Sequence, residues 1–117
     1  MNYVVIREHK SNYPNPITLE KDERVLVGKK YEGKEGWDNW RYCYKLDKSQ
    51  EGWVPEQLII LSGKYGIIKE NYTAKELTIK AGETLKGIKE LNGWVWCRDK
   101  EGREGWIPKL NLKALEK

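Results

Sequence analysis

Few residues in this chain are suited to covalent or metal chemistry. The 117 residues include two cysteines, Cys43 and Cys97, and one histidine, His9. A zinc site usually takes four protein ligands, so these three residues do not make one, and no Gly-rich phosphate loop occurs. Spacing places no serine, cysteine or carboxylate pair to act with His9, which we interpret as a surface loop residue. We therefore expect no enzyme, no cofactor and no metal site.

Tryptophan offers a different chemistry, the burial of apolar ligand surface, and the chain has six of them. Trp94 and Trp96 lie two residues apart, so on a strand both point to one face while Val95 and Cys97 point to the other. The smaller pair suits a tight interior, which predicts outward indoles on a binding surface. The alternative is that the indoles pack between two domains. Cys97 and Cys43 are expected to act as small buried hydrophobes.

These residues belong to a pattern that the chain contains twice, and such a repeat organises the whole fold. Four blocks recur in the same order: residues 3–6 and 65–68, 17–25 and 77–85, 40–43 and 94–97, and 51–55 and 104–108. The copies predict two domains, residues 1–61 and 65–117, joined by a short linker at 62–64. A linker of this length spans at most about 10 Å, so the copies should pack together or hold a restricted angle.

Each copy has the spacing of short β-strands. Apolar residues alternate with a period near two, as in Leu77 and Ile79 or Val25 and Val27. Turn signals such as Asn92-Gly93 interrupt the runs. We expect about five short strands per copy, and a unit this small covers its edges by curling into a barrel. The predicted class is all-β, with two small five-stranded barrels.

The composition bears on location and charge. The longest aliphatic run, residues 58–61, is far shorter than the roughly 20 residues of a membrane helix. No apolar stretch of the kind a secretory signal needs follows Met1. The net charge is +4, but lysines alternate with glutamates, which is typical of a solvated surface. We expect a cytoplasmic protein that does not bind membranes.

The second copy resembles the Src-homology-3 (SH3) family. Residues 76–85, 93–98 and 105–108 follow the order of that family's signatures, and the first copy is similar, with Asp22 where the second has Gly82. The resemblance implies SH3-like barrels that recognise extended proline-rich segments. Such a peptide forms a stiff polyproline helix that loses little entropy when it docks on aromatic ridges.

The resemblance also implies roles for particular residues. Trp94 matches the tryptophan that packs on the ligand, Trp106 and Pro108 match the groove floor, and Glu76 matches the acidic residue that pairs with a ligand arginine or lysine. In the first copy Pro16 takes the acidic place. The residues expected to bind peptide are Trp94, Trp96, Trp106, Pro108, Glu76, Trp40, Trp53 and Pro55.

The chain departs from the family at the tyrosines that build the proline slots. The family's leading Ala-Leu-Tyr-Asp-Tyr block appears as residues 66–70, and its closing tyrosine falls at Asn111 or Leu58. Tyr72 and Tyr13 lie in the matching first loops and are candidates to replace the missing rings.

The leading hypothesis is a noncatalytic adaptor or regulatory module that binds a protein or peptide weakly. A second reading is single-stranded nucleic acid, because the segment 28–39 interleaves basic and aromatic residues: Lys29, Lys30, Tyr31, Lys34 and Trp37. A flexible loop insertion without a binding role explains the composition of this segment equally simply. A third reading is attachment to cell-wall peptidoglycan, which the absence of an export signal disfavours.

Overall fold

Strands make up the regular structure. The computed structural model describes residues 1–11, 14–32 and 39–115, and within them it has two five-stranded sheets, one two-stranded sheet and two short 3-10 turns. No α-helix occurs in this described part. Within the same ranges, no helix has the length and apolar character needed to cross a membrane. The predicted all-β class with two small barrels is confirmed.

The chain divides into two compact units. The continuous unit is Asn15–Ala74, and the split unit combines Met1–Pro14 with Lys75–Lys117. The elements of the continuous unit are β2 (Thr18–Leu19), β3 (Arg24–Lys30), β4 (Trp40–Lys45), β5 (Glu51–Pro55), η1 (Glu56–Leu58), β6 (Ile59–Ser62), β7 (Tyr65–Ile68) and β8 (Tyr72–Thr73). The elements of the split unit are β1 (Asn2–Val5), β9 (Thr84–Leu91), β10 (Trp94–Arg98), β11 (Glu104–Pro108), η2 (Lys109–Asn111) and β12 (Leu112–Ala114).

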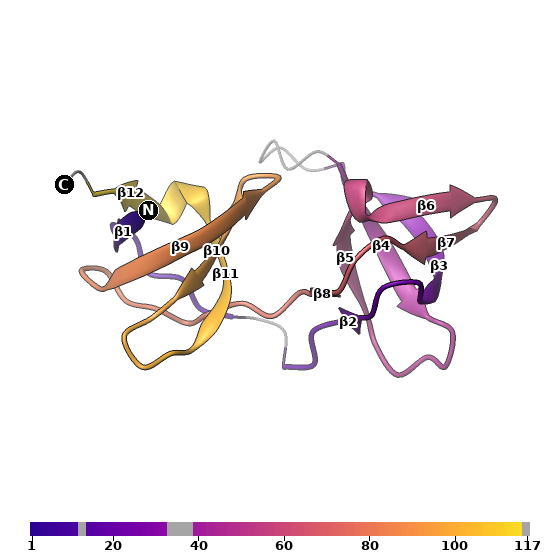
Figure 1. The fold of residues 1–117 in the computed structure, drawn as a ribbon, viewed down its shortest axis with the longest axis horizontal. Coiled ribbons are helices and arrows are strands. Elements are labelled where there is room, and N and C mark those ends of the chain that lie inside the picture. Colours follow the sequence, from indigo (N-terminus) through magenta and orange to yellow (C-terminus); the bar gives the residue numbers. More distant parts are fainter. Residues whose placement is uncertain (12–13, 33–38, 116–117) are drawn as a thin grey trace. The chain divides into compact units, whose positions relative to one another are not determined.

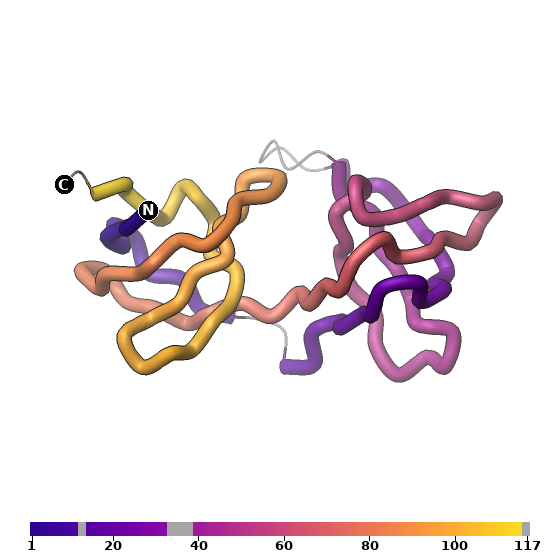
Figure 2. Tube along the Cα trace, viewed as in Figure 1, coloured from indigo at the N-terminus to yellow at the C-terminus, as the bar shows by residue number. Residues whose placement is uncertain are grey.

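The two copies of the sequence have exchanged their first strands. In the split unit the strand order is β11-β10-β9-β1-β12, so the first strand of the first copy pairs with strands of the second copy. In the continuous unit the order is β5-β4-β3-β7-β6, so β7 of the second copy completes the first. Figure 1 shows indigo β1 among the orange and yellow strands of the split unit. In Figure 2 the indigo start of the trace and its orange and yellow end belong to the same unit.

A tight turn between the copies accounts for this exchange. Ser62 and Tyr65 are opposite each other in the antiparallel β6–β7 pair, which leaves a two-residue loop of Gly63 and Lys64. Gly63 has a φ of 62°, and glycine is favoured at the first position of such hairpin loops. The last strand of the first copy and the first strand of the second copy therefore form a hairpin. Residues 62–64, predicted to link two domains, are instead strand and turn inside one unit. The predicted ranges 1–61 and 65–117 describe the sequence copies, whereas the compact units have other boundaries.

The register of the exchanged strands differs by one residue from the sequence match. Tyr3 is opposite Leu85 and Ala114, while Gly66 is opposite the corresponding Val25 and Leu61. Tyr3 therefore corresponds to Gly66 and not to Tyr65, as the matching of residues 3–6 with 65–68 implied. A shift of one residue moves every side chain of a strand to the other face.

The exchanged strands contribute to the core of the unit they join. Tyr3 and Val5 are buried with the apolar residues of the second copy, and Val5 is 1% exposed. The Tyr3 ring fills the space that a Cβ on Gly87 would need. In the continuous unit, Ile68 of β7 is fully buried. Burial of one such side chain stabilises a fold by about 1.5–3 kcal/mol, so each unit depends on the strand it receives.

Equivalent turns hold each exchanged strand in place. The amide of Gly82 donates to the carbonyl of Val5 at 2.8 Å, and the amide of Asp22 donates to the carbonyl of Ile68 at 2.7 Å. Gly82 has a φ of 94° and Asp22 a φ of 72°. Aspartate tolerates this left-handed region better than most residues, which explains how Asp22 stands where the second copy has glycine.

Candidate ligand-binding surface

Strand β10 presents two tryptophans on its outer side. Trp94 and Trp96 are half-buried, while Val95 and Cys97, which alternate with them, are 1% and 0% exposed. The predicted alternation is therefore confirmed. Trp94 is opposite Pro108 in the β10–β11 pair, so both residues sit at the same end of these strands. Pro108 is itself buried.

Trp94 belongs to a cluster with His9 and Glu76 that the sequence did not predict. The Nε2 atom of His9 lies 2.7 Å from Oε1 of Glu76, with side-chain exposures of 13% and 11%. The His9 ring meets the Trp94 ring edge-on, with centroids 5.8 Å apart. Backbone pairing holds His9 and Glu76 in place, since His9 pairs with Ile79 and Glu76 pairs with Trp106. We call these three residues the His9–Glu76–Trp94 cluster.

Trp96 and Trp106 form a second cluster in the split unit. Their rings are T-shaped with centroids 5.3 Å apart, and the Lys89 ammonium lies 5.8 Å from the Trp106 centroid. The Trp96 indole N–H donates to Glu104 at 2.9 Å. Hydrogen bonds from Trp96 and then from Arg98 lower the pKa of Glu104. Trp106 is only 4% exposed, so the residue expected on a groove floor is largely covered.

The continuous unit places its matching residues differently. Trp40 is opposite Pro55 but is 7% exposed, and its indole N–H has no hydrogen-bond acceptor within the described ranges. Pro55 is fully buried. Pro16, at the place of Glu76, is half-buried and brings no charge. Tyr72, at the place of His9, is buried and donates its hydroxyl to the carbonyl of Trp53 at 3.0 Å.

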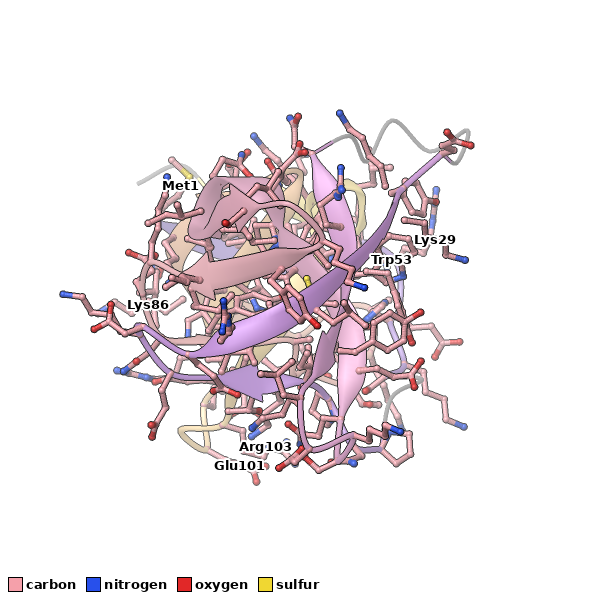
Figure 3. All side chains as sticks on the ribbon, turned by 90° about the vertical axis from the view of Figure 1, so that its right-hand side faces the viewer. Met1, Lys29, Trp53, Lys86, Glu101 and Arg103 are labelled. Atoms are coloured by element: carbon pink, nitrogen blue, oxygen red, sulfur yellow. The ribbon has the colours of Figure 1, made fainter. Side chains whose placement is uncertain are left out.

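Trp53 lies in an aromatic group on the outer side of the continuous unit. Its ring is T-shaped with Tyr31 at 5.2 Å and with Tyr42 at 5.1 Å. The Lys29 ammonium lies 5.9 Å from both the Tyr42 and the Trp53 centroids, and Figure 3 shows the neighbouring Lys29 and Trp53 side chains. Of the basic and aromatic segment predicted at 28–39, Lys34 and Trp37 lie outside the described residues, as does Tyr13.

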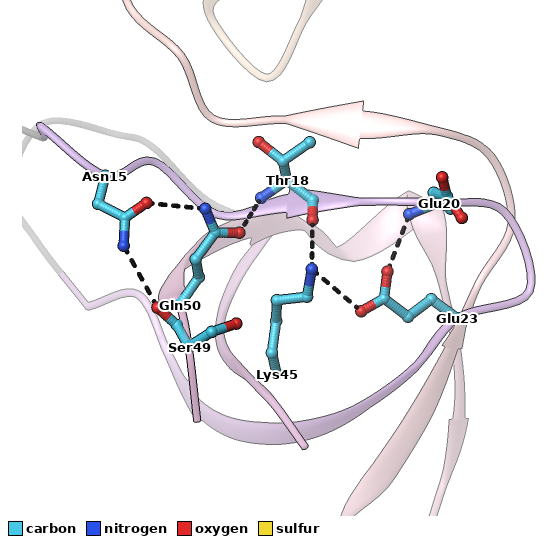
Figure 4. Close-up of a pocket in the computed structure, with 7 residues that line it drawn as sticks. All are labelled: Asn15, Thr18, Glu20, Glu23, Lys45, Ser49 and Gln50. Atoms are coloured by element: carbon cyan, nitrogen blue, oxygen red, sulfur yellow. Dashed lines mark hydrogen bonds and ion pairs between the residues drawn. The ribbon is translucent and has the colours of Figure 1, made fainter. Parts of the chain in front are cut away.

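A polar hollow in the continuous unit has its groups satisfied internally. Gln50 accepts from the Thr18 amide at 2.9 Å and donates to Asn15 at 2.8 Å. Lys45 donates to the Thr18 carbonyl at 3.1 Å and lies 3.6 Å from Glu23 (Figure 4). These bonds join the strands around the hollow, and we assign it no ligand.

The two cysteines are buried and free. Burial raises the pKa of Cys43 to about 12 and that of Cys97 to about 11. The thiolate is the reactive form, so neither residue is suited to nucleophilic chemistry. The prediction that both act as small buried residues is confirmed. No group of three or more metal-ligating side chains occurs in the described residues.

The turn between β10 and β11 is fixed by a buried carboxylate. Oδ1 of Asp99 accepts from the amides of Glu101 and Arg103, both at 2.9 Å, and Oδ2 accepts from Arg103 Nε at 2.7 Å. Figure 3 labels Glu101 and Arg103 in this turn. Burial alone would raise the pKa of Asp99, but the hydrogen bonds from Arg103 and Glu101 outweigh it and lower the pKa. The turn thereby fixes the end of the strand that carries Trp94.

The architecture defines the class of protein, a tandem of small all-β barrels with tryptophans on β4, β5, β10 and β11. A family model described as variant SH3 domain matches residues 2–62 and again residues 65–114, and the chain belongs to this family. SH3 domains are generally protein-interaction modules and are typically noncatalytic. No curated protein and no solved structure gives a match to the chain.

Proposed function

We propose that this protein is a noncatalytic adaptor or regulatory module whose split unit binds an extended, proline-rich segment of a partner protein. The observation that carries this proposal is the meeting of Trp94, Glu76 and Pro108 on one unit. Trp94 is half-buried on the outer side and opposite Pro108, and His9 connects its ring to Glu76. An indole face beside a carboxylate offers an apolar contact and a charged anchor for one ligand.

A proline-rich segment is the ligand this surface suits best. A polyproline helix is already stiff, so it docks on a shallow surface with little loss of conformational entropy. Trp96, which packs against the covered Trp106, lies on the same strand as Trp94 and extends the aromatic surface. We expect weak binding, with a dissociation constant of about 1–100 μM.

The continuous unit makes a smaller contribution in this proposal. Trp40 and Pro55 are buried there, and Pro16 replaces the carboxylate. Trp53 is the residue of that unit's expected set that remains half-buried. We therefore expect a proline-rich peptide to choose the split unit.

The test is a titration with proline-rich peptides, followed by the indole and amide NMR shifts of the whole chain. Trp94→Ala should weaken binding by about 2 kcal/mol or more and leave the stability nearly unchanged, because the ring is on the outer side. Trp53→Ala, a change of the half-buried tryptophan of the continuous unit, should retain the binding. No shift with any peptide, or an equal loss of stability and binding in Trp94→Ala, would refute the proposal.

Single-stranded nucleic acid is a second candidate, because Lys29 lies over the rings of Tyr42 and Trp53. Bases stack on such rings while a lysine meets the phosphate strand. Binding of this kind falls steeply with salt, whereas apolar peptide docking hardly responds. An RNA titration at two salt concentrations, read at the Trp53 indole, distinguishes the two candidates.

A further inference from the structure

The carboxylate of Glu76 already has a hydrogen-bonding partner inside the protein. His9 Nε2 lies 2.7 Å from its Oε1, and both side chains are nearly nine-tenths buried. The same imidazole is edge-on to Trp94 at 5.8 Å. A guanidinium placed here would form a hydrogen-bonded pair with the carboxylate and lie against the indole. His9 thus makes the two contacts that an arginine side chain would make.

We propose that His9 is a built-in competitor for the basic residue of the ligand. The inference rests on the proposed function and identifies the ligand group as a guanidinium. An arginine reaches Glu76 only when the imidazole moves aside, so wild-type protein distinguishes arginine poorly from a neutral side chain of the same shape. Without the His9 imidazole, the same surface should select arginine.

The geometry allows this displacement without unfolding. The backbone of His9 is paired with Ile79 by two hydrogen bonds of 3.0 and 2.8 Å, so its main chain stays on the unit. The imidazole is joined to the cluster by one side-chain hydrogen bond and one ring contact. Rotation about the side-chain torsions therefore opens Glu76 and leaves the strand in place.

The competition also depends on strand exchange. His9 belongs to the first sequence copy, and Glu76 and Trp94 belong to the second. They meet because Met1–Pro14 is part of the split unit. In the continuous unit, Tyr72 takes the corresponding place, and Pro16 offers it no carboxylate. The split unit thus has both the competing imidazole of His9 and the carboxylate of Glu76, whereas the continuous unit has neither at the corresponding positions.

The test uses N-acetyl-arginine amide and its citrulline counterpart, which has the same shape without the charge. Binding to the whole chain is followed by the NMR shift of the Trp94 indole. The two compounds should bind wild-type protein weakly and with nearly equal dissociation constants. In His9→Ala, arginine should bind about tenfold more tightly than citrulline, since one charge-assisted hydrogen bond on a half-buried surface becomes available.

Three further variants make the result decisive. His9→Phe keeps a ring beside Trp94 and releases the carboxylate, so it should also gain arginine preference even if His9→Ala is unstable. Adding Glu76→Gln to either His9 variant should abolish the preference. Tyr72→Phe, the matched change in the continuous unit, should behave as wild type. Equal binding of arginine and citrulline to both His9 variants would overturn the proposal.

The same variants separate this inference from the proposed function. A proline-rich peptide carrying one arginine is titrated beside the small probes. If the small probes show the preference and no peptide binds, then the competition stands and peptide recognition fails. If peptides bind and arginine preference is the same with and without the imidazole, then peptide recognition stands and the role of His9 fails.

Discussion

Strand exchange can be tested with a disulfide that only one arrangement of the chain permits. Val4 of β1 is opposite Lys113 of β12 in the split unit. In the continuous unit the place of Lys113 is taken by Ile60, which is opposite Ile67 of β7. If each sequence copy folded on itself, Val4 would instead be opposite Ile60. The double variants Val4→Cys/Lys113→Cys and Val4→Cys/Ile60→Cys therefore report the two arrangements.

The expected effect is large because the closed loop is long. Directly opposite residues of an antiparallel pair have Cα atoms about 4.5–5.5 Å apart, within the range that a disulfide bridges. Linking positions 4 and 113 closes a loop of about 110 residues. Restricting the unfolded chain in this way stabilises the split unit by about 4–5 kcal/mol. The oxidised Val4→Cys/Lys113→Cys protein should need clearly more urea to unfold than its reduced form.

The assay is oxidation at low protein concentration, followed by non-reducing electrophoresis and mass spectrometry of the linked peptides. Cys43 and Cys97 should not interfere, because burial keeps their thiols protonated. We expect a complete intramolecular link in Val4→Cys/Lys113→Cys and none in Val4→Cys/Ile60→Cys. The opposite result, with Val4 linked to position 60, would show that the copies do not exchange strands and would remove His9 from the Glu76 surface.

Two further outcomes follow from the buried titratable groups. In native protein at pH 8, Cys43 and Cys97 should stay unmodified by a thiol reagent because burial raises their pKa values to about 12 and about 11, and fast labelling without denaturant would contradict this. Asp99→Asn should destabilise the split unit by about 1–3 kcal/mol, since the carboxylate accepts bonds from Arg103 and Glu101. Those hydrogen bonds lower the pKa of Asp99 in the folded protein. The stabilisation from its carboxylate is therefore fully present above the pKa of an unfolded aspartate, near 3.9, and is lost as the pH falls through the folded pKa. The free energy of unfolding of Asp99→Asn, measured with urea, should lack this loss in acid.

Local patterns predicted the elements of the fold well. The alternation at residues 94–97 predicted which side chains of β10 are buried, because strand periodicity depends only on neighbouring residues. Asp22 was matched to Gly82 by position, and both have positive φ. The two five-stranded barrels followed from the repeat and from the turn signals. The first two of these features are settled within a few residues of sequence.

Those local patterns did not predict which strands pair with each other. Tyr3 and Gly66 fill equivalent positions between equivalent neighbours, so strand alternation by itself does not choose between the two units. The match of Tyr3 with Tyr65 rested on residue type, although Tyr65 is half-buried on the outer side and Tyr3 is in the core. Residue similarity without register information therefore gave the wrong offset.

The lack of information on strand partners also explains why the sequence predicted only part of the candidate site. Trp94, Glu76 and Pro108 all lie in the second copy, so motif spacing was enough to group them. His9 was interpreted as a surface loop residue because none of its partners is near it in the sequence. Residue spacing within either copy does not relate a residue of the first copy to the acidic residue of the second.

The short connection between the copies favours the exchange of their first strands. The hairpin formed by β6 and β7 closes a loop of two residues, whereas pairing β6 with β1 would close a loop of more than fifty. The entropy cost of closure grows with loop length, and hairpins form within microseconds. Once β7 has taken its place beside β6 and β3, the matching place for β1 is beside β9 and β12. The short turn at Gly63 and Lys64 thus decides which unit receives His9, and with it which carboxylate has an internal partner.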